Sequence, residues 1–490
     1  MKTVLTIGLS LLLGSAAFAQ TSPAAPAAAT WHPRVFSPQE LRQDFDSLHA
    51  WLQSTHPDLY VAVRRKRAER RWQAARAQLT RPMTRREFLL LTAPLTTQYQ
   101  DGHTGLYLDA EDEEGRAYDE HGRRFFPLNV RVKDGQLYAA NSLNSQLIRP
   151  GARITRLNGV PAAQLVAQMK PYWFHDHEAN LESTLSRFFN TSLWFVRGWG
   201  RQVEVEFVNY GTRQRQRETL AGVPYAQVAP YIYPGRKRQR LTIHEPERLA
   251  VLEFTGFADT PATSAFLDSA FTVIRSRHIG HLAVDIRRNG GGNSAVGDNL
   301  LRYLTRKPYL QGAAKELKYS TAVPGLARNA WFRRSLVAHA GQFVDNRLRL
   351  DFTPTTPAPL VRPELFFTGQ VYLLTSPRTF SSGHMLAAAV KTYQLGTVVG
   401  EETGNAMNFF GEVLGFQLPH TGLEASCSAA QWWSAGLTDA NRRRGVQPDV
   451  PVPTTIRDLA EGRDAVLEYL KTTIRAGAGS PTASAARGAR

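Results

Sequence analysis

Two adjacent serines stand where an apolar strand passes into a helix. The segment TSPRTFSSGHMLAAAVK, residues 375–391, follows the apolar run Val371–Leu374 and contains Ser381 and Ser382. Serine is a frequent helix N-cap, because its oxygen accepts a bond from a free N–H of the first turn. The same place suits a nucleophile, because those N–H groups and the positive end of the helix dipole can hold an oxyanion. One of the two serines is therefore a candidate nucleophile for acyl transfer.

A second loop offers the other half of such a site. The sequence RRNGGGN follows an apolar strand that ends near Ile286, and it contains the three glycines 290–292. Glycines let a backbone approach a substrate closely and aim an N–H at it. The loop lacks the Gly-Lys-Ser/Thr of a phosphate-binding loop and the spacing of a dinucleotide fingerprint. Hydrolysis of an acyl bond needs a nucleophile, a base and oxyanion donors, and these two loops could supply two of the three.

The elements around these loops predict how they are positioned. From about residue 240 to 475, apolar strands alternate with helical segments, which indicates parallel pairing with helices on the faces. Active sites of such sheets lie at the carboxyl ends of the strands. We therefore expect an α/β catalytic core over 240–475, with both loops at one edge of its sheet.

The chain before this core is first helical. SPQELRQDFDSLHAWLQ starts with Ser37 and Glu40 in a capping-box pattern, and a second helix starts with Thr84 and Glu87. The segment QDGHTG then places His103 in a turn before an alternating strand. We assign 34–115 to an N-terminal helical region.

Residues 125–222 are typical of a small β-rich module. Turns are expected at Asp134-Gly135, Pro150-Gly151 and Asn158-Gly159, between strands of alternating polarity. Before the last hairpin comes a long segment rich in Trp and Phe, residues 172–200, expected either to cover a binding groove or to form a second binding or subunit surface. Its HDHE run, residues 175–178, has no partner at a metal-ligand spacing and is expected to be a solvated loop.

The N-terminal segment predicts that the protein is exported. MKTVLTIGLSLLLGSAAFAQ has a positive start, a short apolar stretch and a small-x-small site, so 1–19 is predicted to be a signal peptide cut after Ala19. A Pro/Ala-rich linker over 20–33 follows, and 476–490 forms a similar, disordered tail. No other segment is long and apolar enough to serve as a transmembrane anchor. We expect a periplasmic or extracellular protein.

Charge and cysteine content narrow the function further. The formal net charge is +17, but the basic runs are scattered and not interleaved with aromatic residues on one element, so nucleic acid is not the expected partner. The one cysteine, Cys427, cannot form an internal disulfide and lies in an apolar alternating stretch typical of a buried position.

Four stretches carry a resemblance to a known family. VDIRRNGGGNS resembles an Asp-x-Arg-x-Asn-x-Gly-Gly loop, and SPRTFSSGHMLAAAVKTYQLGTVVGEETGN resembles a nucleophile block that ends in Val-Gly-Glu-x-Thr. GVQPDVPVP resembles a closing Gly-x-x-Pro-Asp segment, and PGARITRLNGVPA resembles a PDZ domain. Together they resemble the tail-specific, or C-terminal processing, serine peptidases of family S41. The resemblance implies a crotonase/ClpP-like core preceded by the helical region and a PDZ-like module.

The resemblance also assigns residues. The nucleophile of the family falls on Ser381, while Ser382 and Gly292 would each give a backbone N–H to the oxyanion hole. One branch of the family uses a Ser/Lys dyad, but its lysine aligns with Ala406, and Lys391 would project from the far end of the helix that follows Ser381.

The branch that resembles tricorn core protease and retinoid-binding-protein-like members takes a histidine from an Asp-Gly-His-Thr-like turn. His103 in QDGHTG fits that position, and an imidazole can take the serine proton and return it to the leaving amine. His384, three residues after Ser381, replaces the usual glutamate of the family; we interpret it as a supporting residue, with the role of base as the alternative.

The acid that should orient the histidine is less defined. That branch carries a glutamate just before the closing segment, where this chain has Arg442, and Asp439 is the nearest carboxylate upstream. Asp439 is the predicted third member. Asp101, two residues from His103, is the alternative, and Asp449 is expected to be structural.

The sequence thus predicts an exported serine peptidase that forms an acyl-enzyme on Ser381 with His103 as general base, without metal or cofactor. Its substrates would be peptides or unfolded proteins, and its oligomeric state is undetermined. A homologue that binds peptides or small apolar ligands without cleaving them is the alternative. A basic scaffold that binds the cell envelope is a third interpretation, since the net charge and the PDZ-like module would suit it equally.

Overall fold

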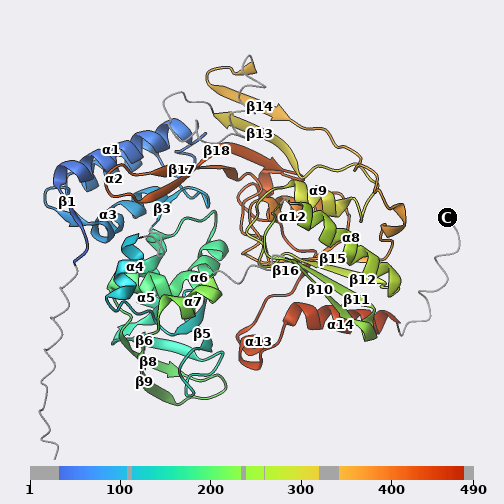
Figure 1. Ribbon diagram of the computed structural model, residues 1–490, viewed down its shortest axis with the longest axis horizontal. Helices are drawn as coiled ribbons and strands as arrows, with labels where there is room; N and C mark the ends of the chain where they lie inside the picture. The colour runs from blue at the N-terminus through green and yellow to red at the C-terminus, as the bar shows by residue number, and fades with distance from the viewer. Residues whose placement is uncertain (1–31, 108–112, 233–238, 259, 319–341, 479–490) are drawn as a thin grey trace, which may run out of the picture. The chain divides into compact units, whose positions relative to one another are not determined.

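The computed structural model in Figure 1 describes residues 32–107, 113–232, 239–258, 260–318 and 342–478. The predicted signal peptide, nearly all of the linker and most of the predicted tail lie outside these ranges. No helix among the described residues is both long enough and apolar enough to cross a bilayer.

Three helices open the described chain, and both predicted capping boxes are present. Ser37 pairs with Glu40 at the start of the first helix, and Thr84 pairs with Glu87 at the start of the third. Pro94 lies within this third helix, which nevertheless continues to Thr97. The helices are α1 (Pro38–Thr55), α2 (Arg65–Arg76) and α3 (Arg85–Thr97), and a two-stranded pair, β1 (Val35–Phe36) and β2 (Met83–Thr84), ties their ends together.

These helices share a hydrophobic core with an antiparallel sheet. Trp72, Phe45 and Phe88 are fully buried in it, together with Cys427 and Leu414 from the sheet. The strand order is β14 (Arg347–Asp351), β13 (Gly312–Lys318), β18 (Glu424–Ser434), β17 (Phe410–Gln417), and β3 (Gly105–Tyr107) pairs with β18. Because β3 begins two residues after His103, this pairing fixes the turn that carries the histidine.

The segment predicted as a PDZ-like module contains the expected hairpins. The Asp134-Gly135 turn joins β4 to β5, and the Asn158-Gly159 turn joins β6 to β7. The strands are β4 (Leu128–Lys133), β5 (Gln136–Ser142), β6 (Arg153–Leu157), β7 (Val160–Pro161), β8 (Gln202–Val208) and β9 (Arg215–Ala221). Helices α5 (Ala162–Met169) and α6 (Glu178–Arg197) lie within the segment, and α4 (Glu113–Glu120) and α7 (Tyr225–Ile232) flank it.

This module offers no open strand edge where the sequence suggested one. In a PDZ-like module the turn 149–162 would present a groove for an added peptide strand, but here β6 is paired with β5 on one side and with β8 on the other. At the outer edge, α6 covers β4: the N–H of Val132 donates to Ser186 Oγ (2.8 Å), and Asn190 Nδ2 donates to the carbonyl of Leu128 (2.9 Å). Strand addition at β6 or β4 is therefore blocked, because the backbone groups it would use are already paired.

The predicted catalytic core is an α/β sheet of six strands. Its order is β10 (Gln239–His244), β11 (Leu249–Phe254), β12 (His281–Asp285), β15 (Gln370–Thr375), β16 (Thr397–Gly400), β19 (Val450–Pro451), with β10 antiparallel and the others parallel. Helices α8 (Pro261–Ser276), α9 (Ala295–Leu301) and α12 (Ser382–Thr392) share one core with this sheet. On the other face lies α14 (Ala465–Ala478), preceded by α13 (Ile456–Glu461) (Figure 1).

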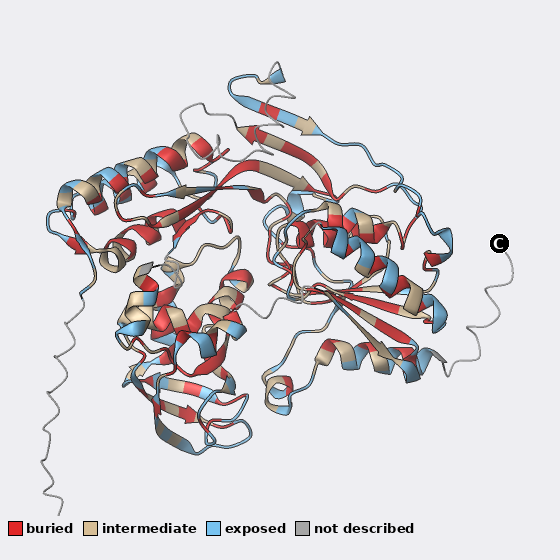
Figure 2. Cartoon of the chain, viewed as in Figure 1, coloured by how far each residue is buried: buried red, intermediate tan, exposed pale blue. Residues whose placement is uncertain are grey.

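The burial pattern follows these layers. Strands β11 and β16 and the residues 382–390 of α12 are almost entirely buried, whereas α8 and α14 keep an exposed stripe (Figure 2). Strands β12 and β15 are parallel neighbours in which Asp285 faces Leu374, so their carboxyl ends coincide. The expectation that the two loops meet at one edge of a parallel sheet is confirmed.

Candidate active site

Ser381 occupies a strained turn between β15 and α12. Its backbone has φ 51° and ψ −127°, a region that residues with a side chain rarely adopt. Its side chain makes no capping bond, although it stands at the N-cap position, and its backbone N–H donates to Asn405 Oδ1. The simple capping role is therefore not what this serine performs. It is partly exposed, with its hydroxyl at the positive end of a helix.

Ser382 is placed differently. It is buried, with 6% of its surface exposed, and its hydroxyl donates to the carbonyl of Gly292 (2.7 Å). That bond ties the start of α12 to the glycine loop. Of the two serines, only Ser381 has a hydroxyl that is not engaged in this way.

The glycine loop lies directly against Ser381. A Cβ on Gly291 would lie 3.1 Å from Ser381 Oγ, and Gly291 and Gly292 have φ of 102° and 133°. Phe257 holds the loop, since its N–H donates to Gly291 O (2.8 Å) and its carbonyl accepts from Asn293 (2.9 Å). In the described chain, neither the N–H of Gly292 nor that of Ser382 donates a hydrogen bond to a protein group. These are the two donors that the resemblance assigns to an oxyanion.

His103 packs against the residue that precedes Ser381. Its ring centroid lies 4.7 Å from that of Phe380, and its side chain is 10% exposed. Its Nδ1 is buried without a hydrogen-bond partner among the described residues. No hydrogen bond joins His103 to Ser381 in the described part of the chain. The structure thus brings the predicted base to the nucleophile turn but leaves the catalytic hydrogen bond unformed.

Asp101 holds the turn in which His103 lies. Its fully buried carboxylate accepts hydrogen bonds from the N–H of His103 (2.9 Å), from Thr104 Oγ1 (2.5 Å) and from Ser428 Oγ (2.7 Å). His56 Nε2 lies 3.1 Å from the same carboxylate. Burial acts to raise the pKa of Asp101, but the hydrogen bond and charge of His56 outweigh it, so the pKa lies below its usual range.

The nearest carboxylate oxygen of Asp101 lies 3.9 Å from His103 Nδ1, which is beyond hydrogen-bonding distance. Asp101, the alternative acid of the sequence analysis, is thus beside the histidine. Asp439 is not: it lies in the short 3-10 helix Asp439–Asn441, its side chain is 95% exposed, and it pairs with Arg442 (2.9 Å). A side chain so exposed cannot orient an imidazole whose Nδ1 is buried and unpartnered, so the structure offers no support for Asp439 as the third member.

The other candidate bases are occupied elsewhere. Lys391 pairs on the surface with Asp449 (2.7 Å) at the far end of α12. His384 is fully buried, with its ring nitrogens 2.7 Å from Thr403 Oγ1 and 3.1 Å from Ser434 Oγ. Burial lowers the pKa of His384 to about 3, so it remains neutral and serves as a structural link.

Asp176 is a member of the site that the sequence analysis missed. It belongs to the HDHE run, which was expected to be a solvated loop, and that expectation is wrong. Its Oδ1 accepts from the N–H of Gly102 (2.6 Å), and its Oδ2 accepts from Asn405 Nδ2 (2.8 Å) and from the N–H of Ala406 (2.9 Å). Because Asn405 Oδ1 in turn holds the N–H of Ser381, one carboxylate links the histidine turn to the nucleophile turn.

The residues around Asp176 reinforce this link. His177 Nε2 donates to the carbonyl of Thr403 (2.9 Å), and Asn180 Nδ2 donates to that of Pro377 (3.2 Å). Burial, and then the negative charge of Asp101, raise the pKa of Asp176. No spacing rule would have found this residue, since it lies far in sequence from both turns that it joins; its one local signal is a carboxylate between two histidines at the start of a helix.

Comparison with known proteins places this arrangement in a class. Residues 248–452 match the model of peptidase family S41. The structure of mature CPAF complexed with lactacystin aligns with a TM-score of 0.63 and 15% identity, over 90% of this chain and 98% of that one. The structure of mature CPAF alone aligns with a TM-score of 0.62 and 15% identity, over 90% of this chain and 99% of that one. The photosystem II D1 C-terminal processing protease aligns with a TM-score of 0.42 and 16% identity, over 87% of this chain and 98% of that one. No curated protein sequence matches the chain.

The two CPAF structures share the fold of this chain. Over residues 248–452 the sequence is similar to the serine-type peptidases of family S41.

The ionised state of Asp101 yields a pH prediction. Because the pKa of this carboxyl is lowered on folding, its contribution to stability is fully present above the unfolded pKa of about 4 and is lost as the pH falls through the folded pKa. Asp101→Asn should therefore lower the melting temperature clearly at pH 7, and the difference from the wild type should shrink progressively below about pH 4. Thermal unfolding followed by circular dichroism at several pH values measures it. A difference that grows on acidification would contradict the assignment.

The bridge made by Asp176 yields a second prediction. Asp176→Asn keeps the shape but leaves one oxygen to serve two sets of donors, and an unsatisfied buried donor costs about 1–3 kcal/mol. We expect kcat for peptide hydrolysis to fall by about 10- to 100-fold with a small change in KM, since 1.4 kcal/mol corresponds to a factor of ten. The matched control is Glu178→Gln in the same run, whose carboxylate is mostly exposed and pairs with Lys170. Equal kcat for both variants would show that the bridge has no catalytic importance.

Proposed function

We propose that the chain is an exported peptidase that cleaves polypeptides through an acyl-enzyme on Ser381, with His103 as general base. The observation that carries this proposal is the close approach of the glycine loop to Ser381. It leaves a strained serine beside two backbone N–H groups, those of Gly292 and Ser382, that have no partner among the described residues. Serine hydrolysis requires such an arrangement of a nucleophile with free donors at its side.

The proposed reaction proceeds in two halves. His103 takes the proton of Ser381 Oγ as this oxygen attacks the carbonyl carbon of the scissile peptide bond. The N–H groups of Gly292 and Ser382 bind the oxyanion, and the proton on His103 passes to the leaving amine as the C–N bond breaks. Water then attacks the acyl-enzyme, giving its proton to His103, and the serine is restored as the acid product leaves.

The surroundings support each of these roles. Asp101 fixes the backbone at His103 through the N–H of that residue, and Asp176 ties the histidine turn to the loop that holds Ser381. No hydrogen bond joins His103 to Ser381 among the described residues, and catalytic hydrogen bonds of this kind often tighten only when a substrate binds. The negative charge of Asp101, 3.9 Å from His103 Nδ1, favours the imidazolium that forms during the reaction.

Substrate and location follow from the same proposal. The family acts on peptide bonds, so peptides or unfolded proteins are the proposed substrates. The signal-like N-terminus supports export, with the mature chain starting at Gln20.

One observation favours a second candidate, a homologue that binds peptides without cleaving them. The predicted third member, Asp439, is turned to solvent, and no described carboxylate accepts a hydrogen bond from His103 Nδ1. If the imidazole is not oriented, Ser381 would not be activated, while the site would still bind a peptide.

Replacement of single residues separates the two functions. Ser381→Ala should abolish hydrolysis of a denatured protein substrate, and His103→Ala should lower kcat/KM by roughly 10³-fold or more, the scale seen when triad members are removed. Lys391→Ala is the matched control, because its ion pair lies on the surface at the far end of α12, and it should retain most activity.

Rates are measured with purified mature protein and a quenched fluorescent peptide. A wild-type protein that binds the peptide without cleaving it would establish the second candidate. Loss of activity in Lys391→Ala with activity retained in His103→Ala would overturn the assignment of the base.

A further inference from the structure

A large polar cavity lies at the carboxyl ends of the sheet strands, next to the site loops. Its volume is about 500 Å³. Both site loops contribute to its wall, the glycine loop through Arg287 and Arg288 and the nucleophile turn through Ser376 and Arg378. Arg131 of β4 and residues near the start of α14 complete it, so the β-rich module also contributes a charge. Nothing in the proposed reaction uses this cavity.

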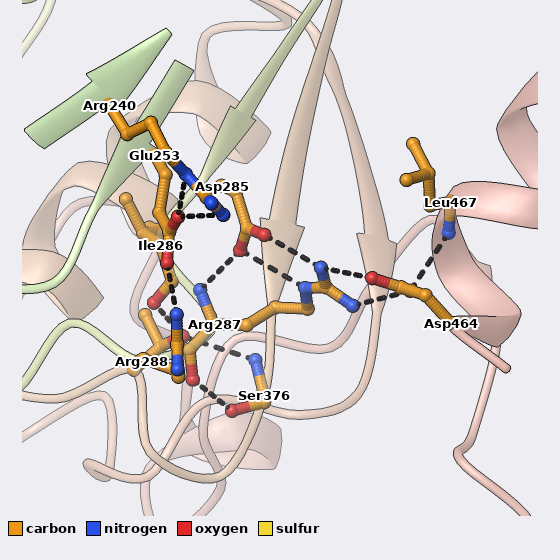
Figure 3. A network of polar contacts seen from close by, with 10 residues as sticks. Arg240, Glu253, Asp285, Ile286, Arg287, Arg288, Ser376, Asp464 and Leu467 are labelled. Atoms are coloured by element: carbon orange, nitrogen blue, oxygen red, sulfur yellow. Dashed lines mark hydrogen bonds and ion pairs between the residues drawn. The ribbon is translucent and has the colours of Figure 1, made fainter. Parts of the chain in front are cut away.

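Most charges in the cavity wall neutralise one another (Figure 3). Glu253 accepts from both Arg240 (2.8 Å) and Arg288. Arg287 lies between two carboxylates, as Figure 3 shows, and donates to Asp285 (2.6 Å) and to Asp464 (2.7 Å).

The remaining carboxylate of the wall is also engaged. Glu401 lies 3.8 Å from Arg131, which is a loose ion pair. The wall thus contains four carboxylates, each of which faces at least one arginine.

Arg378 is the cation that remains. It also lines the cavity, and its guanidinium makes no hydrogen bond or ion pair with any described residue. It is partly buried, and burial together with the positive charges of Arg187, Arg288 and Arg131 lowers its pKa to about 10. A cation that is desolvated among like charges is unfavourable by itself, and a bound anion would relieve that cost.

The position of Arg378 indicates which molecule carries that anion. Arg378 precedes Ser381 by three residues, so their Cα atoms are at most about 11 Å apart. A polypeptide whose scissile bond lies at Ser381 therefore needs only a few further residues to reach the cavity. An arginine can hold a carboxylate with two parallel hydrogen bonds, and one surplus cation matches a single negative charge.

We propose that this cavity is a substrate subsite in which Arg378 binds a carboxylate of the polypeptide, either its C-terminus or an acidic side chain. The inference rests on the proposed function, since it takes the bound polypeptide as the substrate of Ser381. It adds that the enzyme prefers substrates with a negative charge a few residues from the scissile bond.

Binding is measured in the Ser381→Ala background, where no turnover occurs, with peptides that carry a fluorophore at the N-terminus. One pair differs only in a free or an amidated C-terminus. A second set is amidated and has a single Glu or Gln moved along the peptide one position at a time. We expect the carboxylate form of at least one pair to bind about 10-fold more tightly, because the neutral form loses its charge-assisted hydrogen bonds to the guanidinium. The pair that shows the preference identifies the source of the carboxylate.

Arg378→Gln, added to this background, should remove the preference. Arg240→Gln is the matched control: it removes the same charge from the same wall, but from an arginine already paired with Glu253. It should leave most of the preference. Arg378→Lys, which keeps the charge without the planar fork, should give an intermediate preference and guards against a folding defect in Arg378→Gln, checked by melting temperature.

Equal binding of charged and neutral peptides, or a preference that survives Arg378→Gln, would overturn the subsite. Hydrolysis by the protein with native Ser381 separates this failure from failure of the proposed function. Cleavage without a charge preference rejects the proposed carboxylate subsite alone. Charge-selective binding without cleavage rejects the proposed peptidase function and supports the carboxylate-binding cavity.

Discussion

The site depends on one steric constraint, the contact between the glycine loop and Ser381. A side chain at Gly291 would meet the nucleophile itself, and the loop keeps its place because Phe257 holds it on one side and Ser382 binds it on the other. The strained backbone of Ser381 is maintained by the same contacts, together with Asn405. Because β12 and β15 are adjacent parallel strands, the two loops start from the same edge of the sheet. Short loops are therefore enough to bring the glycines into contact with Ser381.

His103 reaches this place by a different route. It enters at the end of the helical region, fixed by the pairing of β3 with β18 and by the buried carboxylate of Asp101. Asp176 then joins the histidine turn to the nucleophile turn from the start of α6, whose side chains also close the edge of β4. The site is thus assembled from three regions of the chain, and α6 contacts both the β-rich module and the catalytic loops.

Much of this arrangement could be predicted from the sequence where a local pattern controls it. The capping boxes at Ser37 and Thr84, the turn at Asp134-Gly135 and the alternation of strands with helices are local signals, and the structure contains each of them. The choice of Ser381 over Ser382 came from the resemblance and agrees with the bond that occupies the hydroxyl of Ser382.

The predictions that failed concern residues whose partners lie far away in the sequence. Proximity along the chain to the closing segment suggested Asp439, but Arg442 pairs with it at the surface. The HDHE run has no local partner in the sequence, because the partners of Asp176 lie 74 and more residues away. The groove expected at 149–162 was lost for the same reason, since β8 pairs with β6 only after a long helical insertion.

In the proposed mechanism Ser381 is an activated nucleophile and His103 activates it. A fluorophosphonate probe reacts with such serines, and mass spectrometry of the digested protein locates the adduct. We expect a single adduct on Ser381, formed much more slowly in His103→Ala and at an unchanged rate in Lys391→Ala. Absence of the adduct in the folded wild-type protein, or its appearance on Ser382, would contradict it.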